Sequence, residues 1–227
     1  MRAFSLIVST KTFTPHACQG LIVLEGVNGA GKSTLQEKIK NHFSATHKVV
    51  TSFEPGGTPL GQSLRKLLLE KQSMSISPLA EALLFSADRA EHVRSLIRPQ
   101  LMSGSLVLLD RYYYSTVAFQ GYGHELPIEP LLQLSEIAIQ GQRPDLVLLI
   151  DLPPEEGLRR NADKEEEDKF EDEELEFHER LRMGFLELAE RLPEPFAILD
   201  GMKSSEEIFA EAKELVQKVV DSTISIP

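Results

Sequence analysis

Residues 26–33 read Gly-Val-Asn-Gly-Ala-Gly-Lys-Ser, which is the spacing of a phosphate-binding loop. Glycines let the backbone turn tightly and bring its N–H groups onto phosphate oxygens, where a side chain would collide. Lys32 supplies a mobile charge for the β- and γ-phosphates, and we expect it to face solvent, while the Ser33 hydroxyl can ligate Mg²⁺. The motif predicts an ATP site made of Gly26, Val27, Asn28, Gly29, Ala30, Gly31, Lys32, Ser33 and Thr34.

A second candidate pair, Asp110 and Arg111, follows the apolar run at 105–109. Ligands of open parallel sheets bind at the carboxyl ends of the strands, so we expect both side chains near the loop. Asp110 could hold a Mg²⁺-bound water and Arg111 could reach a second phosphate; the simpler interpretation is a surface salt bridge. The signatures of guanine-nucleotide switches and of ABC transporters are missing from the sequence, and Asn28 breaks the dinucleotide-binding pattern.

Hydrophobic runs alternate with helical patterns along the chain, which predicts a parallel sheet covered on both faces, an α/β fold. The strands are expected at 21–25, 48–52, 105–109, 145–150 and 196–199. Helical segments are expected at about 32–45, 59–71, 78–103, 112–120, 128–140 and 204–220, and a charged helical region at about 155–191. Pro78 opens the third of these helices, because proline is accepted in a first turn. No repeat and no interdomain linker is found.

Size and charge narrow the class of protein. The chain has 227 residues, enough for a packed core, and a net charge of −11. This negative charge argues against a nucleic-acid-binding surface, because such a surface needs clustered Lys and Arg. The single cysteine excludes an internal disulfide and fits a reducing compartment. No apolar run approaches the roughly 20 residues of a membrane span. Residues 1–19 lack acidic side chains and are rich in Ser and Thr, a composition also found in targeting peptides. Because Arg2 and Lys11 are too few basic residues for such a peptide, the segment is interpreted as a disordered or loosely packed extension.

Several sequence blocks together resemble thymidylate kinase of the bacterial type. They are Leu24-Glu25-Gly26 with the loop, Glu54-Pro55-Gly56-Gly57-Thr58, Leu84-Phe85-Ser86-Ala87-Asp88-Arg89, Asp110-Arg111-Tyr112, Ala118-Phe119-Gln120-Gly121, Pro144-Asp145-Leu146 and Phe177-His178-Glu179-Arg180-Leu181-Arg182. The resemblance covers about residues 20–220. It implies a three-layer α/β/α fold of the phosphate-loop nucleoside monophosphate kinases, with five parallel strands and a helical lid. The domain would span 20–222, with the lid at about 158–173 and a tail at 223–227.

The activity that this resemblance implies is phosphoryl transfer from ATP to dTMP, with Mg²⁺, by a cytoplasmic homodimer. Ser33 and Asp110 would then be the metal-binding residues, and Lys32, Arg111 and Arg160 the catalytic ones. Two alternatives stay open: a kinase for another nucleoside monophosphate, and an ATP-dependent switch that has no acceptor.

The resemblance also assigns an acceptor site. Phe85 and Arg89 lie four residues apart on one predicted helix and therefore share a face, where the ring could stack on thymine. Arg89 could donate to the O4 carbonyl of the base or to the phosphate, and Arg111 would clamp the phosphate. The predicted dTMP-binding set is Glu54, Phe85, Arg89, Arg111, Thr116, Phe119 and Gln120. Phe119 would lie near C2′ of the sugar, whereas Glu54 would act near the metal or the sugar, or only cap a turn.

Three positions depart from the family pattern. Asn28 stands where relatives commonly carry Asp or Glu, and Phe53 stands where many carry Arg. Relatives with glycine at position 29 place a catalytic arginine in the lid, where this chain has Lys169 at the most similar position. The candidates to contact the transferring phosphate are Arg159, Arg160, Lys164 and Lys169. The acidic run around them is interpreted as a solvated helix face.

Overall fold

The computed structural model describes residues 20–69, 75–161 and 169–224. The extension expected at 1–19, with Cys18, and the lid residues 162–168, with Lys164, lie outside the described residues. Within the described part, no helix is long and apolar enough to cross a membrane.

A five-stranded sheet forms the middle of the molecule, with strand order β2-β3-β1-β4-β5 and every pair parallel. The strands are β1 (Leu21–Glu25), β2 (Val49–Phe53), β3 (Leu106–Asp110), β4 (Leu146–Asp151) and β5 (Phe196–Asp200). This confirms the parallel sheet and places each predicted strand within one residue of its observed bounds. Because β1 is central and flanked by β3 and β4, the loop that follows it emerges at the middle of one sheet edge.

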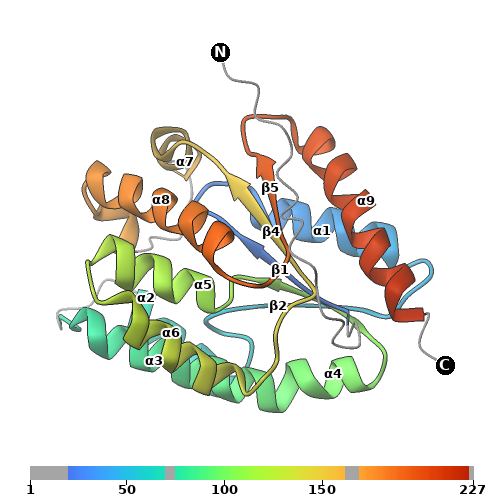
Figure 1. Ribbon diagram of the computed structural model, residues 1–227, viewed down its shortest axis with the longest axis horizontal. Helices are drawn as coiled ribbons and strands as arrows, with labels where there is room; N and C mark the ends of the chain where they lie inside the picture. The colour runs from blue at the N-terminus through green and yellow to red at the C-terminus, as the bar shows by residue number, and fades with distance from the viewer. Residues whose placement is uncertain (1–19, 70–74, 162–168, 225–227) are drawn as a thin grey trace.

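Helices cover both faces of the sheet (Figure 1). On one face lie α1 (Lys32–Phe43) and α9 (Ser205–Ile224), which pack against each other. On the other face α4 (Arg98–Met102) and α8 (Leu175–Arg191) contact strands, beside α3 (Pro78–His92), α5 (Tyr113–Thr116) and α6 (Ile128–Ile139). The remaining helices are α2 (Pro59–Leu69), which packs on α3, and α7 (Pro154–Asn161). The three-layer architecture is the one expected.

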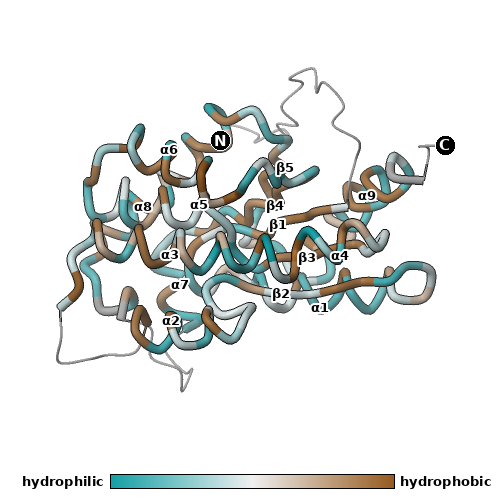
Figure 2. The backbone as a smooth tube through the Cα atoms, turned by 90° about the horizontal axis from the view of Figure 1, so that it is seen from below, coloured by the Kyte–Doolittle hydropathy of each residue, from teal (hydrophilic) through white to brown (hydrophobic). Residues whose placement is uncertain are grey.

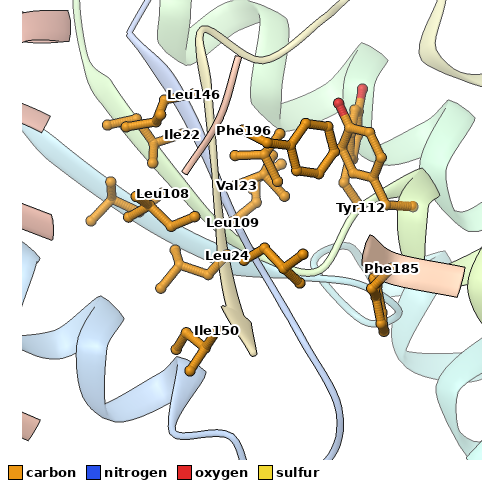
Figure 3. Packing of buried hydrophobic residues seen from close by; sticks show 14 of the residues in the cluster. Ile22, Val23, Leu24, Leu108, Leu109, Tyr112, Leu146, Ile150, Phe185 and Phe196 are labelled. Atoms are coloured by element: carbon orange, nitrogen blue, oxygen red, sulfur yellow. The ribbon is translucent and has the colours of Figure 1, made fainter. Parts of the chain in front are cut away.

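The core lies between the strands and the helices on each face. The run Leu21–Leu24 is wholly buried, because a parallel strand covered on both faces meets apolar neighbours on each side. Figure 3 shows Val23, Leu109 and Phe196 gathered in this core. In Figure 2 the hydrophobic colour follows the central strands, while the helices alternate between hydrophobic and hydrophilic residues. This rigid sheet holds the loops at its carboxyl edge.

Two predicted helices are interrupted. The helix expected at 78–103 begins as predicted, with Ser77 as N-cap and Pro78 in the first turn, but it passes through a π-helical segment, η1 (Val93–Ile97), before α4. Pro99 has no N–H to donate in the following turn, which agrees with a break in regular bonding here. The helix expected at 112–120 is likewise α5 followed by a π-helical segment, η2 (Val117–Gly123).

The charged helical region expected at 155–191 is divided into separate elements. The structure has α7, then a short 3₁₀ turn, η3 (Lys169–Asp172), and then α8. An acidic sequence pattern identifies exposed positions, but it does not say where the backbone turns between them.

Candidate active site

A cavity of about 960 Å³ opens at the carboxyl ends of β1, β2 and β3. Most of the predicted site residues line it: Asn28, Gly29, Lys32, Ser33, Glu54, Phe85, Arg89, Asp110, Arg111, Thr116, Phe119 and Gln120. The fold therefore brings the residues predicted for the donor and for the acceptor into one cleft. Of the other predicted residues, Gly26, Val27, Ala30, Gly31 and Thr34 belong to the loop or the first turn of α1 without lining the cavity, and Arg160 does not line it either.

The phosphate loop depends on glycine at three positions. Gly26, Gly29 and Gly31 have φ angles of 138°, 76° and 95°, which residues with a side chain rarely adopt. At Gly29 the space is closed as well, because a Cβ there would lie 2.2 Å from the carbonyl oxygen of Gly157 in α7. Gly31 is the N-cap of α1, so the free N–H groups of the first helical turn lie at the cleft, where they can bind an anion.

Lys32 does not face solvent, so that expectation is wrong. Its side chain is folded back into the loop: Nζ donates to the carbonyl oxygens of Gly26 (3.1 Å) and Val27 (2.9 Å), and the residue is only 7 % exposed. A buried ammonium group is costly unless it is hydrogen-bonded, and the loop offers these two inward-facing carbonyls. The charge is thus held inside the curve of the loop, where phosphate oxygens would bind.

Ser33 and Asp110 meet across the cleft, since Ser33 Oγ donates to Asp110 Oδ2 at 2.8 Å. One residue comes from the start of α1 and the other from the end of β3. In the described residues no group of three or more His, Cys, Asp or Glu side chains could hold a metal ion. Mg²⁺ in nucleotide enzymes is commonly held by one or two protein oxygens together with phosphates and water, so this pair fits that ion.

Arg111 lies between the loop and the acceptor side of the cleft. Its Nη1 donates to Gly26 O (3.1 Å) and Ser115 Oγ (2.8 Å), and its Nη2 donates to Asn28 Oδ1 (2.6 Å). Its φ of 72° is left-handed, which is uncommon for a residue with a side chain. The guanidinium also lies over the Phe119 ring, 5.2 Å from the centroid. The residue is therefore held from several sides.

Glu25, the last residue of β1, supports Arg111 from beneath. The carboxylate accepts from Tyr112 N (2.8 Å) and Ser115 Oγ (2.7 Å), and it lies 3.8 Å from Arg111 Nη1. Burial raises the pKa of this carboxyl, and the Arg111 charge opposes part of that rise. Sequence reasoning gave Glu25 no role, although an acid at the end of a buried apolar strand was a visible signal.

The acceptor side of the cleft is aromatic with a few buried polar groups. Phe85 and Arg89 both line it, as their helical spacing predicted, and Arg89 Nη2 donates to Thr116 Oγ1 at 3.2 Å. Gln120 Nε2 donates to Glu81 Oε2 at 3.2 Å, which fixes the orientation of the amide because an ionised carboxylate only accepts. Arg89 Nη1 and Gln120 Oε1 are buried without a hydrogen-bond partner. On this side of the cleft Arg89 therefore offers a donor and Gln120 an acceptor to a planar ligand.

Glu54 does not extend toward the Ser33–Asp110 pair. Its Oε2 accepts from Arg89 Nε (2.8 Å) and its Oε1 pairs with His92 Nδ1 (2.9 Å), all buried. The carboxylate thus contacts the acceptor side of the cleft through Arg89.

Asp88 is a buried carboxyl beside this group. Burial, with the Glu54 charge as a second cause, raises its pKa from 3.8 to about 6. A carboxyl with a raised native pKa destabilises the fold as pH rises toward that pKa. We expect the free energy of unfolding of Asp88→Asn, measured relative to wild type, to rise by about 1 kcal/mol between pH 5 and pH 7.5. The wild type loses stability as this carboxyl ionises, and pH 5 lies about one pKa unit below its native pKa. Denaturant unfolding at both pH values measures this, and an equal difference at both would contradict it.

The structure shows the contacts of two residues that depart from the family pattern, Asn28 and Phe53. Asn28 accepts from Arg111 and donates from Nδ2 to Glu171 Oε1 at 3.4 Å, so it bridges the loop, Arg111 and the turn η3. Phe53 is 44 % exposed at the mouth of the cavity, with the Arg65 guanidinium 5.4 Å above its ring centre. A cation is therefore present beside position 53, although it comes from α2.

The two predicted lid arginines, Arg159 and Arg160, pair with Glu156 and do not line the cavity. Arg160 Nε donates to Glu156 Oε1 (2.7 Å) and Nη1 donates to Gly201 O (3.2 Å). Arg159 is largely exposed and pairs with Glu156, whose pKa the two guanidinium groups lower to about 2. Lys169 is described only through the backbone of η3. The contact between a lid cation and the transferring phosphate stays a prediction.

Sequence reasoning missed several residues that line the cavity: Gln36, Arg65, Ser115, Phe170 and Glu171. Gln36 lies four residues after Lys32 on α1, and Ser115 lies four after Arg111, so spacing could have indicated both. Phe170 and Glu171 reach the cleft from a distant acidic stretch that had been interpreted as solvated surface, and no local pattern singles them out.

A family model described as thymidylate kinase matches residues 24–212. A thymidylate kinase of Nitratidesulfovibrio vulgaris is 42 % identical over 214 residues, covering 91 % of this chain and 98 % of the relative. Those of Chlamydia caviae and Carboxydothermus hydrogenoformans are 45 % identical over 189 residues and 46 % over 194, covering 82 % and 85 % of this chain and 91 % and 94 % of the relatives.

Proposed function

Because this chain belongs to the thymidylate kinase family, we propose that its cleft transfers the γ-phosphoryl group of ATP to the phosphate of dTMP, giving ADP and dTDP. The observation that carries the proposal is the 3.1 Å bond from Arg111 Nη1 to Gly26 O. The guanidinium assigned to the acceptor phosphate thus lies against the loop assigned to the donor phosphates, which supports direct transfer between the two.

On the donor side, the loop N–H groups and the first turn of α1 bind the phosphates. Lys32 exchanges the carbonyl oxygens of Gly26 and Val27 for phosphate oxygens, a short movement because its Nζ already lies inside the loop. Ser33 and Asp110 would hold Mg²⁺, which when bound neutralises charge on the β- and γ-phosphates. These groups position the donor and stabilise charge, which is most of what phosphoryl transfer requires.

On the acceptor side, Arg111 holds the phosphate of dTMP in line with the donor. No general base is needed, because the attacking phosphate oxygen is already anionic near neutral pH. Arg160 or a neighbouring lid cation closes over the transferring group, for which Arg160 must release Glu156 and Gly201.

The base is recognised by the unpartnered donor and acceptor of the pocket. Arg89 Nη1 can donate to the O4 carbonyl of thymine, and Gln120 Oε1 can accept from its N3–H, while Phe85 stacks on the ring. Cytosine presents the opposite pattern, an amino donor beside a ring acceptor. Since buried polar groups left unpaired are costly, the pocket is expected to reject dCMP strongly.

We also propose that the enzyme is a cytoplasmic homodimer. Large apolar side chains are exposed on three helices that pack side by side: Leu60 on α2, Leu79 and Leu83 on α3, and Ile137 on α6. A second copy covering this face would remove that apolar area from water. The location rests on the substrates and on the single cysteine. Light scattering should give twice the chain mass of 25.4 kDa.

The function is tested by ADP release from Mg-ATP with dTMP, dUMP, dCMP, dGMP, UMP or AMP as acceptor. We expect dTMP to be the best substrate and dCMP to be slower in kcat/KM by about 10³-fold or more. A higher rate with another monophosphate would favour the kinase of different specificity. ATP hydrolysis that no acceptor stimulates would favour the switch.

Phe119 is expected to select deoxyribonucleotides over ribonucleotides, because its ring would lie against C2′ of the sugar. The methyl that separates thymine from uracil is worth about 0.8 kcal/mol when buried, so dUMP should be a weaker but real substrate. A ribose 2′-hydroxyl against the Phe119 ring would be buried without a partner, at a cost of about 1–3 kcal/mol. The ratio of kcat/KM for dUMP over UMP should therefore exceed that for dTMP over dUMP. Phe119→Ala should reduce the first ratio and leave the second nearly unchanged; equal use of UMP and dUMP by the wild type would remove Phe119 from this role.

A further inference from the structure

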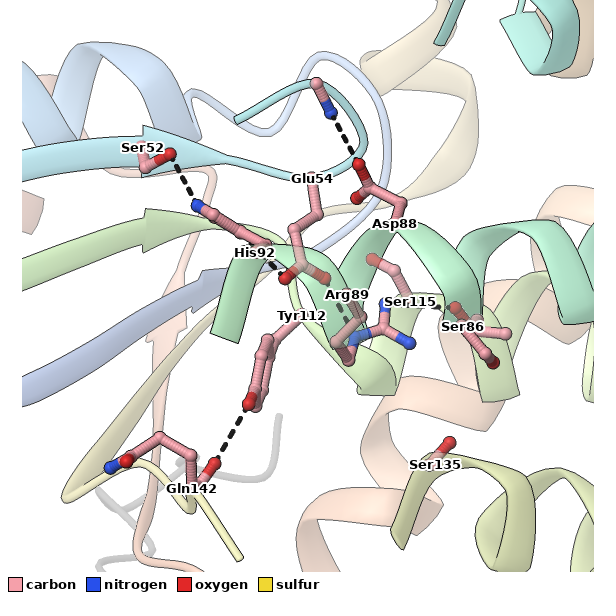
Figure 4. Close-up of polar contacts among 12 residues, drawn as sticks. Ser52, Glu54, Ser86, Asp88, Arg89, His92, Tyr112, Ser115, Ser135 and Gln142 are labelled. Atoms are coloured by element: carbon pink, nitrogen blue, oxygen red, sulfur yellow. Dashed lines mark hydrogen bonds and ion pairs between the residues drawn. The ribbon is translucent and has the colours of Figure 1, made fainter. Parts of the chain in front are cut away.

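Four polar side chains form a continuous hydrogen-bonded row beneath the acceptor pocket (Figure 4). Ser52 Oγ lies 2.8 Å from His92 Nε2, His92 Nδ1 lies 2.9 Å from Glu54 Oε1, and Arg89 Nε donates to Glu54 Oε2 at 2.8 Å. None of the four residues is more than 6 % exposed. The row begins on β2, crosses α3 and ends at a residue that lines the cavity, so it joins the sheet to the pocket.

The direction of the bonds follows from the chemistry of the groups. An ionised carboxylate can only accept, so His92 must donate to Glu54 from Nδ1. In the neutral ring the other nitrogen then accepts from the Ser52 hydroxyl. Both nitrogens of the His92 ring are hydrogen-bonded, which fixes the orientation of the imidazole. Each oxygen of the Glu54 carboxylate also has its own partner, which fixes the orientation of the carboxylate.

The fixed Glu54 carboxylate in turn fixes the orientation of Arg89. Its planar guanidinium is fixed at Nε by Glu54 and at Nη2 by Thr116, and two fixed points determine the direction of the third nitrogen. That third nitrogen, Nη1, is the buried donor without a partner. A rotation of the Glu54 carboxylate would tilt the guanidinium plane and misdirect this donor.

We propose that His92 is a positioning residue for base recognition, which with Ser52 locks the Glu54 carboxylate so that Arg89 presents Nη1 to the base of the acceptor. The proposal rests on the function proposed above. His92 acts through Glu54 and Arg89 and makes no contact with the substrate.

The turn after β2 is packed against this row. A Cβ on Gly57 would lie 2.4 Å from His92 Nε2 and 2.6 Å from Ser52 Oγ. Gly57 has no positive φ in the structure, so its need for glycine is one of space. Gly57→Ala therefore separates Ser52 from His92 without removing any polar group.

The central test compares His92→Leu with His92→Asn. Leucine removes the donor, so we expect kcat/KM for dTMP to fall about 10- to 100-fold and the preference for dTMP over dCMP to shrink by about 10-fold. Because the donor loop is untouched, KM for ATP should stay within about twofold. Asparagine keeps an N–H at the position of Nδ1 and should retain the preference within about threefold.

Two further variants keep the test independent of His92. Ser52→Ala should reduce the preference for dTMP over dCMP by a smaller factor, about 3-fold, and Gly57→Ala should reduce it as well. Ser135→Ala is the matched control: this serine on α6 is also buried, but its hydroxyl donates to Leu131 O away from the row. It should change neither the preference nor KM for either substrate.

A purely structural role for His92 would lower the melting temperature and leave the preference unchanged. An unchanged preference in folded His92→Leu, or the same loss in His92→Asn as in His92→Leu, overturns the positioning role. If His92→Leu fails to fold, unchanged preferences in both Ser52→Ala and Gly57→Ala overturn it. Failure of wild-type protein to phosphorylate dTMP would count against the proposed function, whereas normal wild-type selectivity with unaffected variants would count only against the role of His92.

Discussion

Replacement of Lys32 by alanine is expected to lower kcat by about 10³-fold, because the transferring phosphates lose a preorganised positive charge in the cleft. KM for dTMP should change little, since we propose that Arg111, Phe85 and Arg89 hold the acceptor. The buried position of Lys32 adds a second expectation. Its two bonds to loop carbonyls disappear as well, so the free energy of unfolding should fall by about 1 kcal/mol.

Steady-state kinetics and denaturant unfolding measure the two effects of Lys32→Ala separately. Lys38→Ala on the same helix is a matched control, because its ammonium group pairs with Glu206 at the surface. It should leave kcat unchanged. Turnover of Lys32→Ala within about threefold of wild type would refute the assignment of the phosphate loop.

Removal of the Arg111 side chain should have the second largest effect, a loss of about 10²- to 10³-fold in kcat/KM for dTMP with little change in KM for ATP. The backbone suggests glycine as the replacement, because φ at this residue is 72° and alanine would be strained there. Arg111→Gly therefore removes the guanidinium without adding backbone strain. Its activity should fall much more than its melting temperature does.

Arg111→Lys is a sharper version of the same experiment. Lysine keeps the charge but cannot reproduce the fork that reaches Gly26, Ser115 and Asn28 together. We expect it to recover only part of the lost activity. Full activity in Arg111→Lys would mean that charge alone is needed, and full activity in Arg111→Gly would remove Arg111 from the reaction.

The sequence predicted those parts of the fold that local patterns encode. Buried apolar runs gave each strand to within one residue, and the glycine spacing gave the loop and the start of α1. Side-chain direction was harder, because it depends on groups that become neighbours only in three dimensions. Lys32 was expected in solvent since nothing in the sequence says that two loop carbonyls face inward.

Contacts between segments that are distant in the chain could not be predicted from local sequence patterns either, because the partners become neighbours only in the folded structure. The sequence allows three roles for Glu54: near the metal, near the sugar, or as the cap of a turn. The structure instead pairs its carboxylate with Arg89 and His92, which are 35 and 38 residues away in the chain. Glu171 reaches Asn28 across 143 residues. Periodicity identifies the faces of helices and strands, but it does not say which faces meet.

The contact between Gly29 and Gly157 has a consequence for how sequence can vary around the cleft. A side chain at either position would clash with the backbone of the other segment. A Cβ at position 29 would lie 2.2 Å from the carbonyl oxygen of Gly157, and a Cβ at position 157 would lie 2.5 Å from the carbonyl oxygen of Asn28. Two backbones therefore touch with no side chain between them, and neither can be substituted to compensate for a change in the other. In a saturation library both positions should tolerate glycine alone, even though one lies in the phosphate loop and the other in a helix that forms no part of it.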